Sequence, residues 1–185
     1  MRVPGSFVAI VALSSTGAGC NRSRHERIAS YTPPALSAGF AQRTGAGWRV
    51  AVPSTWRDLA QRGPAAWAVA DPQPVDDFRA NVNVLTESFV GESYDYAKAN
   101  EAALRREARA AVDAIRDDVI DGDPTLLIES SWTPQPPSTT PFRTMQAALA
   151  SRGAGYVVTC SVASVAFERY RSTCESIMRS FAVER

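Results

Sequence analysis

The sequence predicts an α+β domain: an antiparallel sheet of about six strands, with a long central helix and a C-terminal helix packed on it. Three observations support this prediction. Short segments of alternating apolar and polar residues, typical of half-buried strands, lie on both sides of one long amphipathic stretch. Short turns join neighbouring strand segments, which favours antiparallel pairing. A second apolar stripe at helical spacing lies near the end of the chain, and helices cover at least one face of such a sheet.

Three strands are predicted before the central helix. The first covers residues 48–53, where a tryptophan and two valines share one face and a proline ends the run. The second covers residues 66–70 and is ended by the sequence Asp-Pro-Gln-Pro at 71–74. The third covers residues 80–87, with alanine and valines on one face and two asparagines on the other.

A long helix is predicted to begin at Ser93, a good N-cap residue, and to run to about Arg116. Glu101 and Arg105 form an i,i+4 pair of opposite charge in the favourable order on its outer face. The apolar stripe is rich in alanine, which suits close packing on a sheet. Its members are Ala97, Leu104, Ala108, Ala111 and Ile115.

After the break at Asp-Gly-Asp-Pro (121–124), three further strands are predicted over residues 125–132, 142–151 and 156–163. The connection over residues 133–141 contains four prolines, so we interpret it as a rigid connector, with a surface for a partner as the alternative. A C-terminal helix follows. Its apolar stripe comprises Phe167, Tyr170, Cys174, Ile177, Met178 and Phe181.

The N-terminal residues predict export. Arg2, the apolar run over residues 7–13 and the small residues that follow are the parts of a signal peptide, and they lead directly to Cys20. The end of this segment resembles the bacterial lipobox, although Gly17 stands where that pattern prefers leucine. We therefore expect residues 1–19 to be a lipoprotein signal peptide and Cys20 to carry diacylglycerol and palmitate. An ordinary cleaved signal followed by an incidental cysteine is the alternative.

Three regions are expected along the chain: the signal peptide, a flexible tether over residues 20–45, and one domain over residues 46–185. The apolar run is too short to span a bilayer, which needs about 20 apolar residues. Asn21 after the lipidation site resembles the enterobacterial pattern for the outer membrane. The predicted location is therefore a bacterial membrane to which the acylated N-terminus binds, and in a Gram-negative bacterium the outer rather than the inner one.

The composition excludes several function classes. Without Arg2 the chain has 19 basic and 19 acidic residues, and such a neutral chain has no overall electrostatic attraction for nucleic acid. The only histidine is His25, in the predicted tether, so the domain has no histidine for a catalytic triad, a general base or the common zinc sites. No nucleotide-binding or nucleophile-elbow motif is found. We predict no enzyme activity, no cofactor and no metal.

Four aspartates form the densest acidic cluster, but their spacing does not fit a calcium-binding loop. We interpret them as a solvated helix end. They are Asp117, Asp118, Asp121 and Asp123.

Cys160 and Cys174 are predicted to face the same interior, one on the last strand and one on the final helix. Exported proteins meet an oxidising compartment, where such pairs tend to close into a disulfide. A loop of 15 residues gives about 3 kcal/mol in the chain-entropy model. Two buried free thiols are the alternative.

Several short motifs, in their order and spacing, resemble the PsbP-like fold found in bacterial lipoproteins, photosystem PsbP subunits and a nuclear import factor that binds Ran. They are Val-Pro-Ser-Thr-Trp at 52–56, Asn-Val-Asn-Val at 81–84, Pro-Phe-Arg-Thr-Met-Gln at 141–146, Tyr-Val-Val-Thr-Cys at 156–160 and Ile-Met-Arg-Ser-Phe at 177–181. The resemblance implies an antiparallel sheet with helices packed on it, in a non-catalytic binding or assembly protein. It implies no particular ligand or partner residues.

The leading hypothesis is therefore a membrane-anchored, non-catalytic envelope lipoprotein whose domain binds another envelope protein. One alternative is a module for a small apolar or lipid-like ligand, held in a pocket lined by the four tryptophans. The other is a hydrolase that works through carboxylates alone. The tryptophans are Trp48, Trp56, Trp67 and Trp132.

Overall fold

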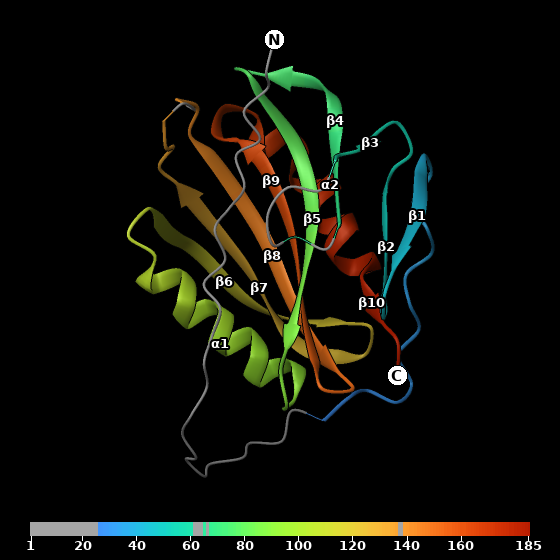
Figure 1. Cartoon of the computed structure of the whole chain (residues 1–185). Coiled ribbons are helices and arrows are strands. Elements are labelled where there is room, and N and C mark those ends of the chain that lie inside the picture. The colour runs from blue at the N-terminus through green and yellow to red at the C-terminus, as the bar shows by residue number, and fades with distance from the viewer. Residues whose placement is uncertain (1–25, 61–64, 66, 137–138) are drawn as a thin grey trace.

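A computed structural model describes residues 26–185 apart from 61–64, 66 and 137–138 (Figure 1). The predicted signal peptide, Cys20 and His25 lie outside the described residues. The chain forms two antiparallel sheets and two helices. Within the described residues, neither helix is long and apolar enough to cross a membrane.

The large sheet has seven strands in the order β3-β4-β5-β9-β8-β7-β6, and every neighbouring pair is antiparallel. Its strands are β3 (Arg57–Asp58), β4 (Trp67–Val75), β5 (Phe78–Ser88), β6 (Ala110–Ile120), β7 (Asp123–Trp132), β8 (Phe142–Ser151) and β9 (Ala154–Ala163). The two strands β8 and β9 in the interior of the sheet are buried along almost their whole length, as expected for strands covered on both faces.

The small sheet has the order β1-β2-β10 and consists of β1 (Phe40–Gly45), β2 (Trp48–Pro53) and β10 (Ala182–Val183). The N-terminal and C-terminal parts of the described chain thus pair through β2. The helices are α1 (Ser93–Arg106) and α2 (Phe167–Ser180), the latter preceded by the 3₁₀ turn η1 (Ser164–Ala166).

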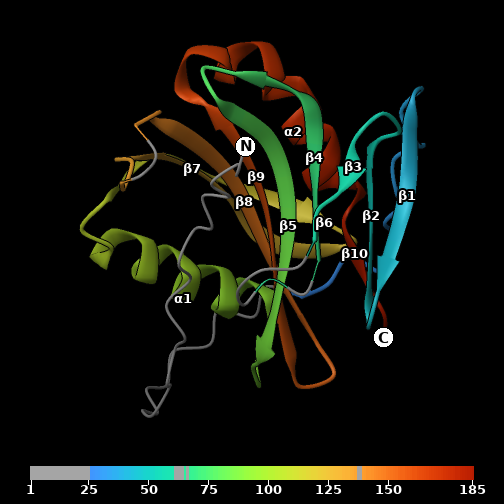
Figure 2. The same ribbon diagram turned by 45° about the horizontal axis from the view of Figure 1, so that its top comes forward.

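The large sheet separates two apolar cores. Helix α1 packs on one face, against β6, β7 and β8, while α2 and the small sheet lie on the other (Figures 1 and 2). The core on the α2 side is the larger. It includes Val50, Val82, Met145, Phe167 and Ile177. The core on the α1 side includes Leu85, Tyr96, Leu104, Ile128 and Trp132.

The predicted fold class is confirmed, because the structure is α+β with helices packed on an antiparallel sheet. The three strands predicted after the central helix coincide with β7, β8 and β9 to within two residues. These segments are strongly apolar and bounded by turn residues, so local pattern and tertiary pairing agree.

The predicted extent of the central helix is wrong. Helix α1 ends at Arg106, and residues 110–120 form strand β6. A tight hairpin joins β6 to β7, with φ of 54° at Asp121 and 83° at Gly122. Asp-Gly is a favoured pair for a two-residue hairpin, and this signal outweighs the helical spacing of the alanines before it. The acidic cluster consequently lies at the end of β6, in the turn and at the start of β7, not at a helix end.

The predicted tether also differs from the structure. Residues 40–45 pair with β2 as strand β1, through a hairpin in which Gly45 lies opposite Trp48. Strand β4 is longer than predicted, because the Asp-Pro-Gln-Pro sequence continues it beyond a register shift between Ala70 and Pro74. Proline is tolerated at such an irregularity, where ladder hydrogen bonds are already interrupted.

Candidate binding region around the small sheet

Residues 26–38, here called the strap, precede β1 and bind the turn between β6 and β7. The backbone N–H of Ile28 donates to the carbonyl oxygen of Gly122 at 2.7 Å, and Nη2 of Arg27 donates to the carbonyl oxygen of Asp121 at 2.9 Å. Nε of Arg27 also lies 3.5 Å from Oδ1 of Asp123. The strap is therefore fastened to the domain by backbone groups and by charge.

The turn permits this close approach because residue 122 is a glycine. A Cβ atom there would lie 3.1 Å from the carbonyl oxygen of Ile28 and 3.1 Å from Cβ of Tyr31. Gly122 also has a left-handed backbone conformation, which glycine adopts at no steric cost. Burial against this turn raises the pKa of the Tyr31 phenol.

The two buried aspartates of the turn bring three parts of the chain together. Oδ2 of Asp123 accepts hydrogen bonds from Oγ of Ser93 at 2.7 Å and from Nη2 of Arg185 at 2.8 Å. Oδ2 of Asp121 accepts from the backbone N–H of Val183 at 3.3 Å. The start of α1, the C-terminal residues and the strap are thereby joined at one turn.

Ser93 does not cap α1 as predicted. The N-cap position is Glu92, and Ser93 is the first helical residue. Its hydroxyl instead bonds Asp123 and accepts from the backbone N–H of Ala150 at 2.9 Å. The serine thus fastens the helix to the sheet.

A groove of about 410 Å³ lies between the strap and the small sheet. Its apolar lining includes Pro33, Pro34, Leu36 and Phe181. Two arginines, Arg49 of β2 and Arg179 of α2, also line this strap groove. Nε of Arg179 lies 3.9 Å from Oδ2 of Asp118, whereas Arg49 has no ion pair among the described residues. Asp121 lines the groove as well, so the groove combines apolar side chains with one acidic residue and with Arg49, which has no described ion pair.

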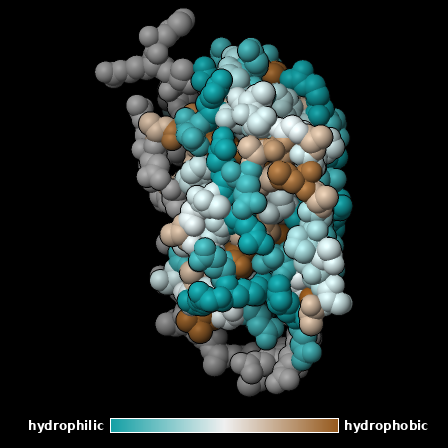
Figure 3. Space-filling view, turned by 90° about the vertical axis from the view of Figure 1, so that its right-hand side faces the viewer, coloured by the Kyte–Doolittle hydropathy of each residue, from teal (hydrophilic) through white to brown (hydrophobic). Residues whose placement is uncertain are grey.

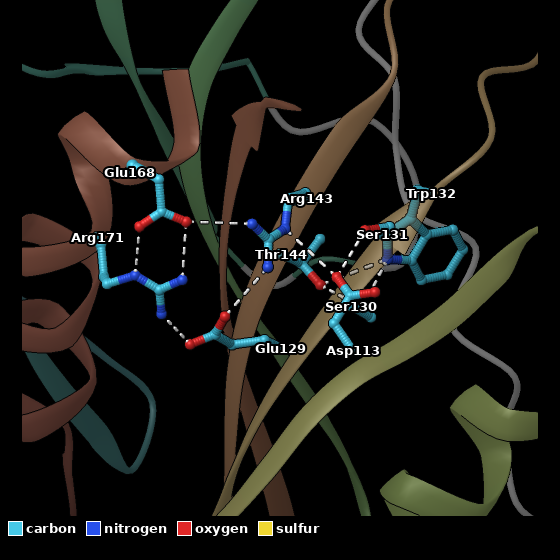
Figure 4. A network of polar contacts seen from close by, with 9 residues as sticks. All are labelled: Asp113, Glu129, Ser130, Ser131, Trp132, Arg143, Thr144, Glu168 and Arg171. Atoms are coloured by element: carbon cyan, nitrogen blue, oxygen red, sulfur yellow. Dashed lines mark hydrogen bonds and ion pairs between the residues drawn. The ribbon is translucent and has the colours of Figure 1, made fainter. Parts of the chain in front are cut away.

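On the other side of α2, charged side chains form a network centred on Arg143 (Figure 4). Its guanidinium nitrogens lie 3.3 Å from carboxylate oxygens of Asp113, Glu129 and Glu168, which come from β6, β7 and α2. Arg171 of α2 binds Glu168 at 2.8 and 2.9 Å and also pairs with Glu129. Hydrogen bonds from Arg171 lower the pKa of Glu168.

This network fastens α2 to the sheet. The guanidinium carbons of Arg143 and Arg171 lie 4.1 and 5.0 Å from the ring centroid of Phe167, so cation–π contacts add to the ion pairs. Each of the three carboxylates is paired with an arginine, and hydrogen bonds to Glu168 lower its pKa. A general acid needs the opposite, a raised pKa, so Glu168 is not suited to that role.

Ser131 of β7 donates to Asp113 at 2.6 Å and so belongs to the same network, whereas Ser130, Trp132 and Thr144 lie in the core on the α1 side. Nε1 of Trp132 donates to Oγ of Ser130 at 2.9 Å, and the hydroxyls of Ser130 and Thr144 are 2.7 Å apart. The Trp132 ring stacks on Phe142 with centroids 5.8 Å apart. Trp132 is thus a buried core residue whose polar atom is satisfied.

The predicted tryptophan-lined pocket is not what the structure contains. Trp48 and Trp67 are in contact on the α2 side, with ring centroids 5.2 Å apart, whereas Trp132 lies on the α1 side of the sheet. Trp48, Trp56 and Trp132 are each only 3% exposed. No tryptophan lines the strap groove or a second cavity of about 350 Å³ beside β6. Their size and apolarity place these rings in the cores.

The second cavity contains two of the four clustered aspartates, Asp117 and Asp118. Consecutive residues of a strand point to opposite faces, so these carboxylates do not face one another. Asp117 accepts a hydrogen bond from the Tyr94 hydroxyl at 3.1 Å. In the described part of the chain, no group of three or more histidine, cysteine, aspartate or glutamate residues is arranged to hold a metal.

Cys160 of β9 and Cys174 of α2 form a disulfide in the structure, with the sulfur atoms 2.09 Å apart and the Cα atoms 5.7 Å apart. Both residues are fully buried. The bond ties the final helix to a central strand at the position where the sequence predicted that the two side chains meet.

This architecture is a PsbP-like α+β fold. The cyanobacterial PsbP protein CyanoP from Synechocystis sp. PCC 6803 matches with a TM-score of 0.54 at 14% identity, over 84% of this chain and 99% of that chain. LpqN, involved in cell envelope biogenesis of Mycobacterium tuberculosis, matches with a TM-score of 0.57 at 11% identity, over 79% of this chain and 91% of that chain. No protein-family model and no curated protein matches the chain. At these identities the similarity establishes the fold.

Sequence reasoning missed the strap and its contact with the turn. The available signals were the Asp-Gly pair at residues 121–122, which is typical of a hairpin, and basic Arg27 in a segment otherwise composed as a linker. Neither signal identifies the other as its partner, because the two segments are far apart in the sequence.

Proposed function

We propose that this chain is an exported lipoprotein, anchored in a bacterial membrane through Cys20, whose non-catalytic PsbP-like domain binds another envelope protein. The observation that carries this proposal is the docked strap. Arg27, seven residues after Cys20, is already bound to the domain at Asp121 and Asp123. Seven extended residues span at most about 25 Å, so a lipid on Cys20 would hold the domain close to the membrane surface.

Two further observations support a binding role. The carboxylates that come together around Arg143 are ion-paired, whereas Arg43 and Arg49 near the strap have no ion pair among the described residues. LpqN, which shares the fold, is involved in cell envelope biogenesis. Arg43 and Arg49 are thus available to bind a partner, whereas the carboxylates around Arg143 hold α2 on the sheet.

Labelling and crosslinking test the anchor and the binding separately. Labelling with radioactive palmitate should mark the wild-type chain, and Cys20→Ala should lose the label and leave the membrane fraction. Unchanged labelling of that variant would overturn the lipid anchor. For binding, a photo-crosslinking residue at several exposed positions should give a discrete adduct with an envelope protein. Absence of any adduct at every position would overturn the binding role.

A lipid-like ligand is a second candidate, and the strap groove is the observation that favours it. Its apolar lining and its two arginines suit an amphiphile with an anionic head. Dodecyl phosphate should bind the purified chain, and Arg49→Gln with Arg179→Gln should weaken binding several-fold. If dodecyl phosphate and uncharged dodecyl maltoside bind equally well, only detergent-like adsorption is occurring.

A further inference from the structure

We infer that the free edge of β1 accepts an extended, acidic segment of the partner protein as an added strand of the small sheet. This inference rests on the proposed function, because it names the chemistry of the envelope protein that the domain binds. Strand addition of this kind uses main-chain hydrogen bonds for affinity and side-chain contacts for specificity.

The outer edge of β1 is unoccupied by any described element. The small sheet has the order β1-β2-β10, so β1 pairs only with β2. In both ribbon views β1 is the outermost element on its side of the molecule (Figures 1 and 2). The strap lies beside one face of the small sheet, where it lines a groove together with Gln42, and no described strand pairs with the outer edge of β1.

The hydrogen-bond pattern identifies the backbone groups that face outward. The carbonyl oxygen of Gly39 accepts from the N–H of Ser54, the residue opposite it in the β1–β2 register. Along one strand of an antiparallel pair, residues whose backbone N–H and C=O groups bond the partner strand alternate with residues whose N–H and C=O groups point to the opposite side. Gln42 and Thr44 therefore direct their N–H and C=O groups to the free edge.

The charges beside this edge call for an acidic partner. Arg43 lies opposite the buried Val50, and its Nε atom is buried without a hydrogen-bond partner among the described residues. Arg49 lies opposite Thr44 on the other face of the sheet, is exposed, and has no described ion pair. An added strand with acidic side chains on both faces would reach both guanidinium groups and satisfy the buried donor.

Figure 3 shows this side of the molecule, where hydrophilic residues predominate and hydrophobic colour is confined to small separate patches. A partner that depends on a broad apolar contact is therefore not suited to it. Backbone pairing and charge fit this surface better.

The other described sheet edges are poor acceptors. Strands β3 and β10 are two residues long. Strand β6 is long, but a register shift between Val112 and Ala114 bends its edge, and its side chains are rich in charge. Natural edges are protected by shortness, bulges and charges. β1 has none of these protections except Arg43, whose charge would attract an acidic strand.

A blocked hexapeptide supplies the probe: fluorescein-labelled TVEEVT-amide, whose adjacent glutamates point to opposite faces of a strand. Its binding to the full chain in detergent micelles is followed by fluorescence anisotropy. Thr44→Pro should weaken binding at least about tenfold, because it removes an outward N–H and leaves the β2 ladder in place. Thr44→Val keeps that N–H and should bind like the wild type.

Charge is tested with the same peptide. Arg43→Gln should weaken binding about fivefold, whereas Arg57→Gln on β3 removes an equal charge elsewhere and should have no effect. Thr44→Asp leaves every backbone group in place and should weaken binding by repulsion, which covers the case in which the proline variant does not fold. Equal binding of TVQQVT, or binding that Thr44→Pro and Thr44→Asp both leave unchanged, would overturn the inference.

Crosslinking separates this inference from the proposed function. A photo-crosslinking residue at Thr44 should capture the envelope partner, and one at Ala102 on the far side, in α1, should not. Capture at other positions but not at Thr44 would leave the binding role standing and reject the β1 edge. Absence of capture at every position would reject the binding role itself.

Discussion

Arg27 and Asp123 form an ion pair, with Nε of the arginine 3.5 Å from Oδ1 of the aspartate. The pair joins the segment that leads back to Cys20 with the hairpin between β6 and β7. The residues expected to be a flexible tether are thus partly a docked element of the domain. The position of the domain relative to its N-terminus is consequently restricted by tertiary contacts.

Release of the strap is the first prediction. Arg27→Ala removes a hydrogen bond and an ion pair of a side chain that is 43% exposed, so the free energy of unfolding should fall by only about 0.5 kcal/mol. Hydrogen exchange of the Ile28 amide, which bonds Gly122, should nevertheless become much faster. Arg57→Ala is the control. Unchanged exchange at Ile28 would show that Arg27 does not hold the strap.

Two glycines with similar backbone conformations allow the energetic effect of the strap contact to be measured separately from backbone strain. Gly122 and Gly153 have φ of 83° and 77°, but a Cβ at residue 122 meets Ile28 and Tyr31, whereas nothing lies within 4 Å at residue 153. Alanine should cost about 1 kcal/mol at either site through the left-handed conformation. Chemical denaturation should show an additional loss for Gly122→Ala. An equal loss of unfolding free energy in both variants would mean that the strap moves away from residue 122 with no loss of stability.

The cysteine pair gives the third prediction. When the purified protein is unfolded without reductant, alkylating reagents should leave Cys160 and Cys174 unmodified, because they form a disulfide. Replacing both by alanine should lower the free energy of unfolding by about 3 kcal/mol. After reduction, both cysteines should react. Alkylation of both residues before reduction would contradict the disulfide.

Acid sensitivity gives the fourth prediction. Hydrogen bonds from Lys98 and Arg105 lower the pKa of Glu101, and those from Arg171 lower the pKa of Glu168. In each case the unfolded chain binds a proton at higher pH than the folded chain does. The contribution to stability is therefore complete above the ordinary pKa of 4.5 and is lost as pH falls through the lower folded value.

Denaturation at a series of pH values checks this expectation. The wild-type free energy of unfolding should decrease as the pH is lowered below 4.5. In a double variant, Glu101→Gln with Glu168→Gln, the free energy of unfolding should decrease less steeply as the pH is lowered. The control variant Glu92→Gln, at an exposed position, should follow the wild-type curve. Identical slopes in the wild type and the double variant would show that these ion pairs do not contribute.

The fold and the residues near the candidate site were only partly predictable from the sequence. Cys160 and Cys174 were located because each lies in phase with apolar neighbours, and that periodicity is local. The wrong helix prediction over residues 107–116 has the opposite origin. Alanines there satisfy helical spacing, but pairing with β7 across the Asp-Gly turn stabilises a strand more than the intrinsic preference stabilises a helix.

By itself, the sequence determined the fold class, the three strands β7 to β9 and the meeting of the two cysteines. These features depend on apolar periodicities within single elements, which the local sequence displays. Tertiary structure alone decided that the strap docks, that Asp123 joins Arg27, Ser93 and Arg185, and that β1 has a free edge. The physical reason is that these contacts join segments far apart in the chain, and only folding brings such segments together.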